Sequence, residues 1–309
     1  MRIALDAMGG DHAPEVPLKA ARDLASVPGL ELVLLGPEQV LRGAVPPNVT
    51  IRDAPETVAM DEHATAALRQ KRASSIAVGI EMVGKGEAQA FVSAGNTGAI
   101  MAAALMGLGR QEGVDRPALA VPFPTDRGVS LLLDAGANAD AKPAYLVQFA
   151  RLGVEYARKA LSIERPRVAL LNIGEEAGKG NQLARESYDL LRESGLDFVG
   201  NVEGKDLPKG LADVIVTDGF TGNVVLKVAE GVSESLVSSL RTALTSRWHY
   251  KLAAGVLRPA FRSVARRLDY SEYGGAPLLG VRGTVIIGHG RSDSRAIYNA
   301  VLVAMKAAT

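Results

Sequence analysis

The chain has 309 residues, of which 47% are hydrophobic, and its 35 Lys and Arg residues balance 34 Asp and Glu residues. This balance gives no reason to expect a nucleic-acid partner, because proteins that bind nucleic acids carry an excess of positive charge. The absence of cysteine excludes disulfides, thiolate metal sites and a cysteine nucleophile. No apolar run reaches the ~18 residues of a membrane span, and Met1 leads into an apolar segment without a signal-peptide pattern, so we expect a cytoplasmic protein.

Short apolar runs alternate with helical patterns along most of the chain. The runs are continuous, as in strands buried on both faces of a parallel sheet. The alternation predicts the α/β class, with a mostly parallel sheet in an α/β/α sandwich and a single domain that spans residues 1–309. The predicted strands are 2–7, 30–36, 49–54, 88–94, 119–124, 129–137, 166–174, 196–202, 212–219 and 283–290, and helical patterns cover 97–110, 143–160, 181–194 and 292–307.

The segment 231–270 departs from this alternation because it contains only helical patterns. Its part from Arg241 to Arg267 holds seven basic residues (Arg241, Arg247, Lys251, Arg258, Arg262, Arg266 and Arg267) and no acidic one. Gly255 and Pro259 should break the helix within an apolar stretch. We therefore predict an inserted hairpin of two basic amphipathic helices, joined by an apolar turn near these two residues.

Glycine-rich polar segments follow five of the predicted strands. In α/β proteins ligands bind at the carboxyl edge of the parallel sheet. Glycine lets backbone N–H groups approach a ligand, and the N-terminus of the following helix favours an anion, most often phosphate. Simple turn formation is the alternative interpretation. The segments are DAMGGDHAP (6–14), SAGNTGA (93–99), DAGANADAKP (134–143), NIGEEAGKGN (172–181) and TDGFTGN (217–223).

Several known catalytic patterns do not match. GEEAGKG (174–180) is one residue too short for a nucleotide-binding P-loop, and MGGDHAP (8–14) lacks the G-x-G-x-x-G spacing. No G-x-S-x-G motif of a serine hydrolase is present. A site rich in backbone N–H groups and asparagine, but poor in nucleophiles, suits a reaction in which the substrate supplies the nucleophile.

The histidines give no metal-binding pattern, because no two of them lie at i, i+4 spacing. We therefore expect no metal and no cofactor. Two of them lie in turns at the ends of predicted strands and can contact a ligand or only stabilise a loop. The four are His12, His63, His249 and His289, and the two at strand ends are His12 and His289.

Together the motifs resemble the bacterial phosphate acyltransferase family of phospholipid synthesis. The resemblance runs in order from Met1 to beyond Ala296. It implies transfer of a long-chain acyl group from acyl-acyl carrier protein to inorganic phosphate, a fold similar to phosphotransacetylases and isocitrate dehydrogenases, and a homodimer that associates peripherally with the membrane. The motifs that carry it are MRIALDAMGGDHAP, SAGNTGA, DRPALA, LLLDAGAN, LLNIGEE, KGN, VTDGFTGNV, GGAPLLG and HGRSDSRAI.

The resemblance implies two catalytic residues. Lys179 matches the family's catalytic lysine, with a role in phosphate binding and charge stabilisation, and Asn223 matches the catalytic asparagine. Some relatives carry a second lysine where this chain has Gly178, which weakens any two-lysine clamp. The further candidates for phosphate and substrate binding are Gly9, Gly10, Asp11, His12, Ser93, Gly95, Asn96, Thr97, Gly98, Asn138, Gly180, Asn181, Asp218, Thr221 and Gly222.

The basic hairpin allows three interpretations. Its positive surface can dock the acidic carrier protein, its apolar residues can enter an anionic membrane surface, or it can form a dimer interface with a basic rim. The residues expected at a membrane or carrier-protein contact are Trp248, Lys251, Leu252, Val256, Leu257, Arg258, Phe261 and Arg262.

Other activities remain open from the sequence. A short-chain phosphotransacetylase would use acyl-CoA at the same anion site. An NAD-linked decarboxylating dehydrogenase would need metal-binding carboxylates, for which Asp134, Asp140 and Asp218 lie at strand ends without a recognisable spacing. A non-catalytic membrane scaffold is a further alternative. The glycine and asparagine residues at the ends of five predicted strands argue against it, because a scaffold would not need them.

Overall fold

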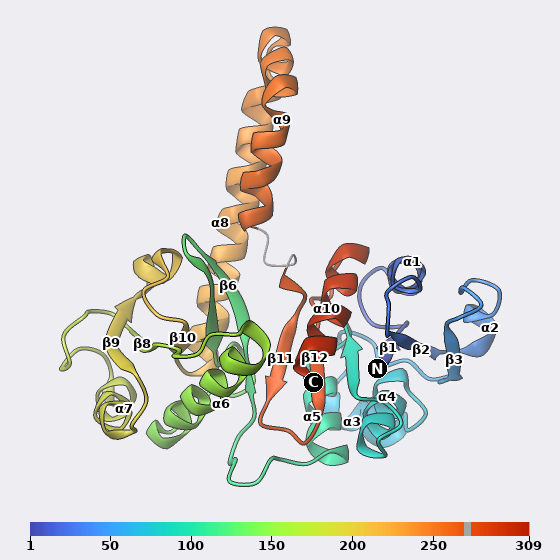
Figure 1. Ribbon diagram of the computed structural model, residues 1–309, viewed down its shortest axis with the longest axis horizontal. Helices are drawn as coiled ribbons and strands as arrows, with labels where there is room; N and C mark the ends of the chain where they lie inside the picture. The colour runs from blue at the N-terminus through green and yellow to red at the C-terminus, as the bar shows by residue number, and fades with distance from the viewer. Residues whose placement is uncertain (269–272, 309) are drawn as a thin grey trace.

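The computed structural model describes residues 1–268 and 273–308 (Figure 1). The strands are β1 (Arg2–Asp6), β2 (Glu31–Gly36), β3 (Thr50–Asp53), β4 (Ala90–Ser93), β5 (Ala118–Leu119), β6 (Val121–Thr125), β7 (Gly128–Leu133), β8 (Val168–Asn172), β9 (Phe198–Glu203), β10 (Val214–Val216), β11 (Ala276–Leu279) and β12 (Thr284–Ile287). The helices are α1 (Glu15–Leu24), α2 (Glu38–Leu41), α3 (Ala64–Gln70), α4 (Ser75–Gly84), α5 (Thr97–Gly107), α6 (Pro143–Leu161), α7 (Gln182–Glu193), the 3-10 helix η1 (Gly204–Lys209), α8 (Gly219–Thr245), α9 (Trp248–Leu268) and α10 (Ser294–Ala307).

The first sheet has the strand order β3-β2-β1-β4-β12-β11-β5. Its strands from β3 to β12 pair in parallel, and β11 is antiparallel to both of its neighbours. Helices α1 and α10 pack on one face, where Leu24 and Val301 are buried, and α4 and α5 pack on the other, where Ile80 and Ile100 are buried. Because the chain leaves β1 in one direction and β4 in the other, the loops after these two strands meet at a topological switch point.

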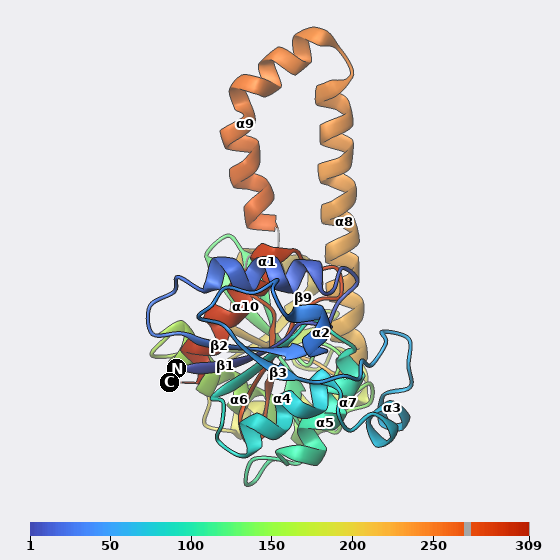
Figure 2. The same ribbon diagram turned by 90° about the vertical axis from the view of Figure 1, so that its right-hand side faces the viewer.

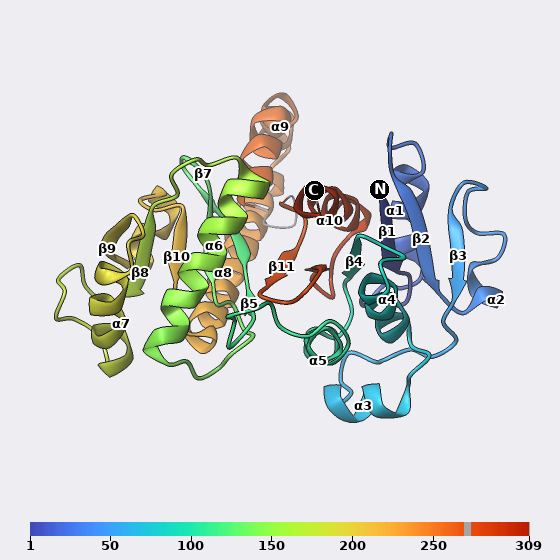
Figure 3. The same ribbon diagram turned by 60° about the horizontal axis from the view of Figure 1, so that its bottom comes forward.

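The second sheet has the order β6-β7-β10-β8-β9, in which only β6 pairs antiparallel. Helices α6 and α7 cover one face with Phe149 and Leu191, and η1 and α8 cover the other with Leu207 and Val225. Figure 3 shows the two sheets side by side, with α6 and α8 on opposite faces of the second one. The predicted α/β class and layered sandwich are confirmed, in two sheets rather than one. The expectation of a single domain stays a prediction.

The prediction of a single strand at 119–124 is wrong, because two strands occupy this stretch. Ala120 separates β5, which belongs to the first sheet, from β6, which belongs to the second, and its backbone N–H bonds to the Pro277 carbonyl oxygen. The apolar run is continuous because the crossing between the sheets is itself buried. The sequence also gave no sign of β11, because it contains Pro277, and proline is disfavoured inside a sheet.

Helices α8 and α9 form an antiparallel hairpin that stands out from the rest of the molecule (Figures 1 and 2). The predicted hairpin is present, but its turn lies between Thr245 and Trp248. The predicted break at Gly255 and Pro259 is wrong, since α9 runs through both residues. A proline within a helix removes one hydrogen bond and bends the helix without having to end it, and Figure 2 shows α9 bent below the tip. Tyr270 and the side chains of Arg262, Arg266 and Arg267 lie outside the described residues.

Within residues 1–268 and 273–308, no helix is both long enough and apolar enough to span a membrane.

Candidate active site

A cavity of about 440 Å³ lies where the two sheets meet. The first sheet contributes residues at the ends of β1, β4 and β12, and the second sheet contributes the loop after β7 and one face of α8. The apolar wall comes from β5, β6, β11, α10 and Leu226 of α8. The polar and charged lining residues are Asp6, Asp11, Ser93, Thr97, Asn223, Lys227, Glu230, His289 and Ser292.

The loops after β1 and β4 are joined by a buried hydrogen bond. The Ser93 hydroxyl donates to Asp6 Oδ2 at 2.6 Å, and the Met8 N–H donates to Asp6 Oδ1 at 2.9 Å. A methyl group on Gly9 would lie 2.6 Å from Asp6 Oδ2 and 2.7 Å from the Gly95 nitrogen, so only glycine fits there. Burial raises the pKa of the Asp6 carboxyl, which favours its neutral form.

Asn96 positions the N-terminus of α5. Its Oδ1 accepts the Ala99 N–H at 3.0 Å, and its Nδ2 donates to the carbonyl oxygens of Ala59, Met60 and Glu62 at 3.0–3.2 Å. All of these contacts are internal to the protein, so Asn96 shapes the site as a helix cap and a loop anchor. The next residue, Thr97, lines the cavity at the positive end of the helix.

Asp134 shapes the loop after β7. Its carboxylate accepts the backbone N–H groups of Leu119, Ala137 and Asn138 at 2.6–3.0 Å, and also the Asn138 Nδ2. Burial raises the pKa of Asp134, and these hydrogen bonds oppose that effect.

Asp218 performs a similar task after β10. Its carboxylate caps α8 by accepting both the N–H and the hydroxyl of Thr221 at 2.8 Å. Of the three carboxylates that the dehydrogenase alternative would need, Asp134 and Asp218 accept internal donors that shape a loop and cap a helix, and Asp140 is an exposed loop residue.

Only one of the two predicted catalytic residues lines the cavity. Asn223 lies on the first turn of α8 and lines the cavity, close to Gly136. Lys179 is exposed in the loop between β8 and α7, where its carbonyl oxygen accepts Asn172 Nδ2 at 3.1 Å, and it does not line the cavity. Because β8 pairs with β10, this loop still lies at the same edge of the second sheet as the start of α8.

The other predicted binding residues divide into two groups. Asp11, Ser93 and Thr97 line the cavity. The remaining ones form the surrounding turns and caps: Gly9, Gly10, His12, Gly95, Asn96, Gly98, Asn138, Gly180, Asn181, Asp218, Thr221 and Gly222. Within the second group, Asn181 caps α7 by accepting the Ala184 N–H at 2.9 Å.

Four charged or titratable lining residues were not among the predicted site residues. Asp6 ends β1 and was included only within the glycine-rich segment 6–14. Lys227 and Glu230 follow Asn223 at i+4 and i+7 on α8, and helical spacing alone could have found them. His289 was considered only as a strand-end histidine. Lys227 Nζ lies 2.8 Å from Glu230 Oε2 and 3.0 Å from His289 Nε2.

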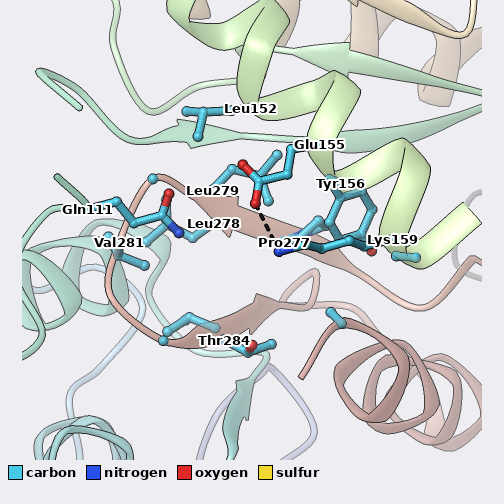
Figure 4. Close-up of a pocket in the computed structure, with 15 residues that line it drawn as sticks. Gln111, Leu152, Glu155, Tyr156, Lys159, Pro277, Leu278, Leu279, Val281 and Thr284 are labelled. Atoms are coloured by element: carbon cyan, nitrogen blue, oxygen red, sulfur yellow. Dashed lines mark hydrogen bonds and ion pairs between the residues drawn. The ribbon is translucent and has the colours of Figure 1, made fainter. Parts of the chain in front are cut away.

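A second cavity of about 110 Å³ lies away from these loops, between α6 and the strands β11 and β12 (Figure 4). Glu155 and Lys159 form an ion pair at its rim at 2.9 Å, and burial raises the pKa of Tyr156 to about 12. None of the predicted site residues lines it.

The arrangement of the elements is that of the phosphotransacetylases. A phosphotransacetylase from Streptococcus pyogenes superposes with a TM-score of 0.67 at 17% identity, over 99% of this chain and 94% of that one. A branched-chain phosphotransacylase from Enterococcus faecalis gives a TM-score of 0.61 at 14% identity, over 100% of this chain and 99% of the other. At sequence identities of 14–17% this likeness shows the fold alone. The fold belongs to the α/β class that the sequence predicted.

The chain belongs to the family described as fatty acid synthesis protein, whose model matches residues 1–309. Similar proteins named phosphate acyltransferase are found in Myxococcus xanthus, at 51% identity over 99% of this chain and 89% of that protein, and in Heliobacterium modesticaldum, at 52% identity over 98% and 93%. A third, from Desulfitobacterium hafniense strain Y51, is 50% identical over 98% of this chain and 92% of its own length.

Proposed function

We propose that this protein is a phosphate acyltransferase that moves a long-chain acyl group from acyl-acyl carrier protein to inorganic phosphate. The product is an acyl phosphate for phospholipid synthesis. The chain is 50–52% identical in sequence to proteins named phosphate acyltransferase, and this identity supports the reaction class. The observation that carries the proposal is the cavity itself, where the N-terminus of α5, Asn223 and Lys227 converge on an apolar wall.

In this reaction a phosphate oxygen attacks the thioester carbonyl carbon, the new C–O bond forms, and the C–S bond breaks. HPO₄²⁻ supplies the proton that ends on the thiol of the carrier protein, so no protein nucleophile is required. Asn223 is suited to donate to the carbonyl oxygen as negative charge develops there, a contribution of roughly 3–4 kcal/mol for a well-placed donor. Lys179 is assigned to phosphate binding by the family resemblance.

The alternative donor is a short-chain acyl-CoA. The fold is shared with phosphotransacetylases, so it does not distinguish the two donors. The apolar wall formed by Leu119, Val121, Leu226 and Ile297 supports a long acyl chain, because burial of each methylene contributes about 0.8 kcal/mol.

A homodimer is supported by exposed apolar side chains on α8. They follow one another at i, i+4 spacing and form a ridge of the kind by which helices pack. A continuous row of apolar side chains in contact with water favours association with a second copy of the chain. Its members are Phe220, Val224, Val228, Val232, Leu236 and Leu240, which are 42–67% exposed.

Peripheral association with an anionic membrane is supported by the distal part of the hairpin. Trp248, Leu252, Val256 and Leu257 are at least half exposed there, and no acidic residue lies between Arg241 and Arg267. Apolar side chains beside basic ones suit the interface of an anionic bilayer.

The test measures release of free thiol from palmitoyl-acyl carrier protein with and without phosphate, beside palmitoyl-CoA and acetyl-CoA and without added metal. Phosphate-dependent release that favours the carrier protein is the expected result. Faster thiol release from acetyl-CoA than from the carrier protein would show that the protein is a short-chain phosphotransacetylase. Absence of thiol release from all three donors would exclude acyl transfer to phosphate.

A further inference from the structure

Lys227 is a charged side chain of the cavity that the family motifs leave without a role. It lies one helical turn after Asn223, so both side chains project from the same face of α8. Residues at this spacing have Cβ atoms about 6 Å apart. A phosphate group between them can contact both.

Glu230 holds the Lys227 ammonium in place. The side chain of Glu230 is 4% exposed and accepts from Lys227 Nζ at 2.8 Å through Oε2, whereas its Oε1 has no hydrogen-bond partner among the described residues. A carboxylate buried in this way is costly unless a cation stays beside it. The pair therefore holds the Lys227 ammonium against the cavity wall.

His289 adds a second donor at the same place. Its Nδ1 accepts the Arg291 N–H at 3.1 Å, and its Nε2 lies 3.0 Å from Lys227 Nζ. The Arg291 contact favours the neutral tautomer with its proton on Nε2, and in that tautomer an ammonium and an imidazole N–H face each other without an acceptor between them. An oxygen anion placed against both donors would supply that acceptor.

The charged groups around this point come from three elements. Glu230 lies on α8, Arg291 follows His289 and pairs with Glu234 at 2.9 Å, and Asp11 belongs to the loop after β1. The Asp11 N–H bonds to the Gly290 carbonyl oxygen at 2.8 Å, which joins that loop to the one that carries His289. Lys227 and His289 therefore lie where the loops of both sheets meet.

We propose that Lys227 and His289 bind the attacking phosphate beside Asn223, and that Glu230 is the residue that positions Lys227. This inference rests on the proposed acyl transfer to phosphate and adds the groups that hold its nucleophile. It places a phosphate-binding lysine on α8 at the wall of the cavity, whereas Lys179 lies in the loop between β8 and α7.

The test compares Lys227→Met with Lys159→Met, which removes a lysine from a Lys–Glu pair on α6 outside the site. Lys227→Met should raise the KM for phosphate at least about tenfold, the effect of one lost charge-assisted hydrogen bond. The KM for the thioester donor should stay within about twofold of wild type. Phosphate should also raise the melting temperature of the wild type, and this rise should be lost in Lys227→Met.

Glu230→Gln tests the positioning role. Without the carboxylate nothing holds the Lys227 ammonium against the cavity wall, so the KM for phosphate should rise while kcat and the KM for the thioester donor stay near their wild-type values. Glu155→Gln, the matched change on α6, should leave the KM for phosphate unchanged. If Lys227→Met does not give the wild-type circular dichroism spectrum, His289→Ala takes its place with the same expected rise in KM.

Each outcome decides between the two proposals. An unchanged KM for phosphate together with an unchanged phosphate-induced rise in melting temperature, in a folded Lys227→Met or His289→Ala, overturns this inference while acyl transfer stands. Absence of thiol release in the wild type overturns the proposed function, and the melting temperatures with inorganic phosphate then still decide whether Lys227 binds the anion.

Discussion

Gly222 lies so close to Asp134 that a methyl group on its Cα would stand 1.9 Å from the Asp134 carbonyl oxygen. This contact sets the first turn of α8 against the loop after β7 and places Asn223 in the cavity. The preceding Gly219 makes a similar approach, and its N–H donates to the Asn138 carbonyl oxygen at 2.8 Å. The glycines of the motif after β10 are thus explained by backbone packing as well as by any bound anion.

Gly222→Ala should therefore displace the start of α8 and lower kcat by at least about tenfold, because catalytic groups displaced by about 1 Å lose much of their effect. Gly231→Ala is the matched control on the same helix, since nothing lies within 4 Å of its added methyl group. The control should keep wild-type activity and gain about 0.5–1 kcal/mol in stability from helix propensity. Thiol-release kinetics and thermal unfolding measure both effects, and equal activity of the two variants would contradict the packing argument.

Asn223→Ala should lower kcat by roughly 10²–10³ without loss of folded structure, as expected for removal of a donor to a developing oxyanion. Lys179→Ala should also lose most of its turnover, because the family resemblance assigns Lys179 to phosphate binding and charge stabilisation. Lys205→Ala removes an exposed lysine of η1, outside the cavity, and serves as the control. The measurement is thiol release at saturating donor, and wild-type turnover in Asn223→Ala or Lys179→Ala would remove that residue from the catalytic assignment.

Val232→Glu together with Leu236→Glu should convert a dimer into a monomer, because it places two charges in the middle of the apolar ridge on α8. Light scattering coupled to gel filtration measures the mass directly. Val199→Glu changes an exposed valine on β9 instead and should leave the mass unchanged. A wild-type chain that is already monomeric at micromolar concentration would contradict the proposed dimer.

Leu257→Glu together with Phe261→Glu should abolish binding to vesicles that contain anionic phosphatidylglycerol, while thiol release from a water-soluble donor stays unchanged. A buried charge in the interface opposes insertion of the hairpin. Leu190→Glu on α7 is the control for a change of charge far from the hairpin. Vesicle sedimentation gives the bound fraction, and undiminished binding of the double variant would remove the membrane contact from α9.

The sequence predicted most elements because the apolar runs and the glycine-rich strand ends are local signals. It did not reveal the division into two sheets, since the buried crossing at Ala120 has the same composition as a strand. Lys227 and Glu230 follow Asn223 at helical spacing, so their place on one face could be derived. Their contact with His289 could not, because it depends on how the loop after β12 approaches α8 from a distant part of the chain.

His289 should make the folded state sensitive to acid. Burial, and then the positive charge of Lys227, lowers the pKa of His289 in the folded protein from its ordinary value of 6.5. The unfolded chain therefore binds a proton first as the pH falls below about 6.5. The stability that His289 contributes is complete above this pH and decreases until the pH falls below the folded-state pKa.

The difference in melting temperature between the wild type and His289→Gln isolates this effect, because other titrating groups such as Asp6 are common to both proteins. The wild type should lose stability relative to His289→Gln between pH of about 7.5 and about 5. In a Lys227→Met background the same comparison should show a smaller acid effect, since one cause of the lowered pKa is gone. A difference that stays constant across this range would mean that the imidazole is as easily protonated in the folded protein as in the unfolded chain.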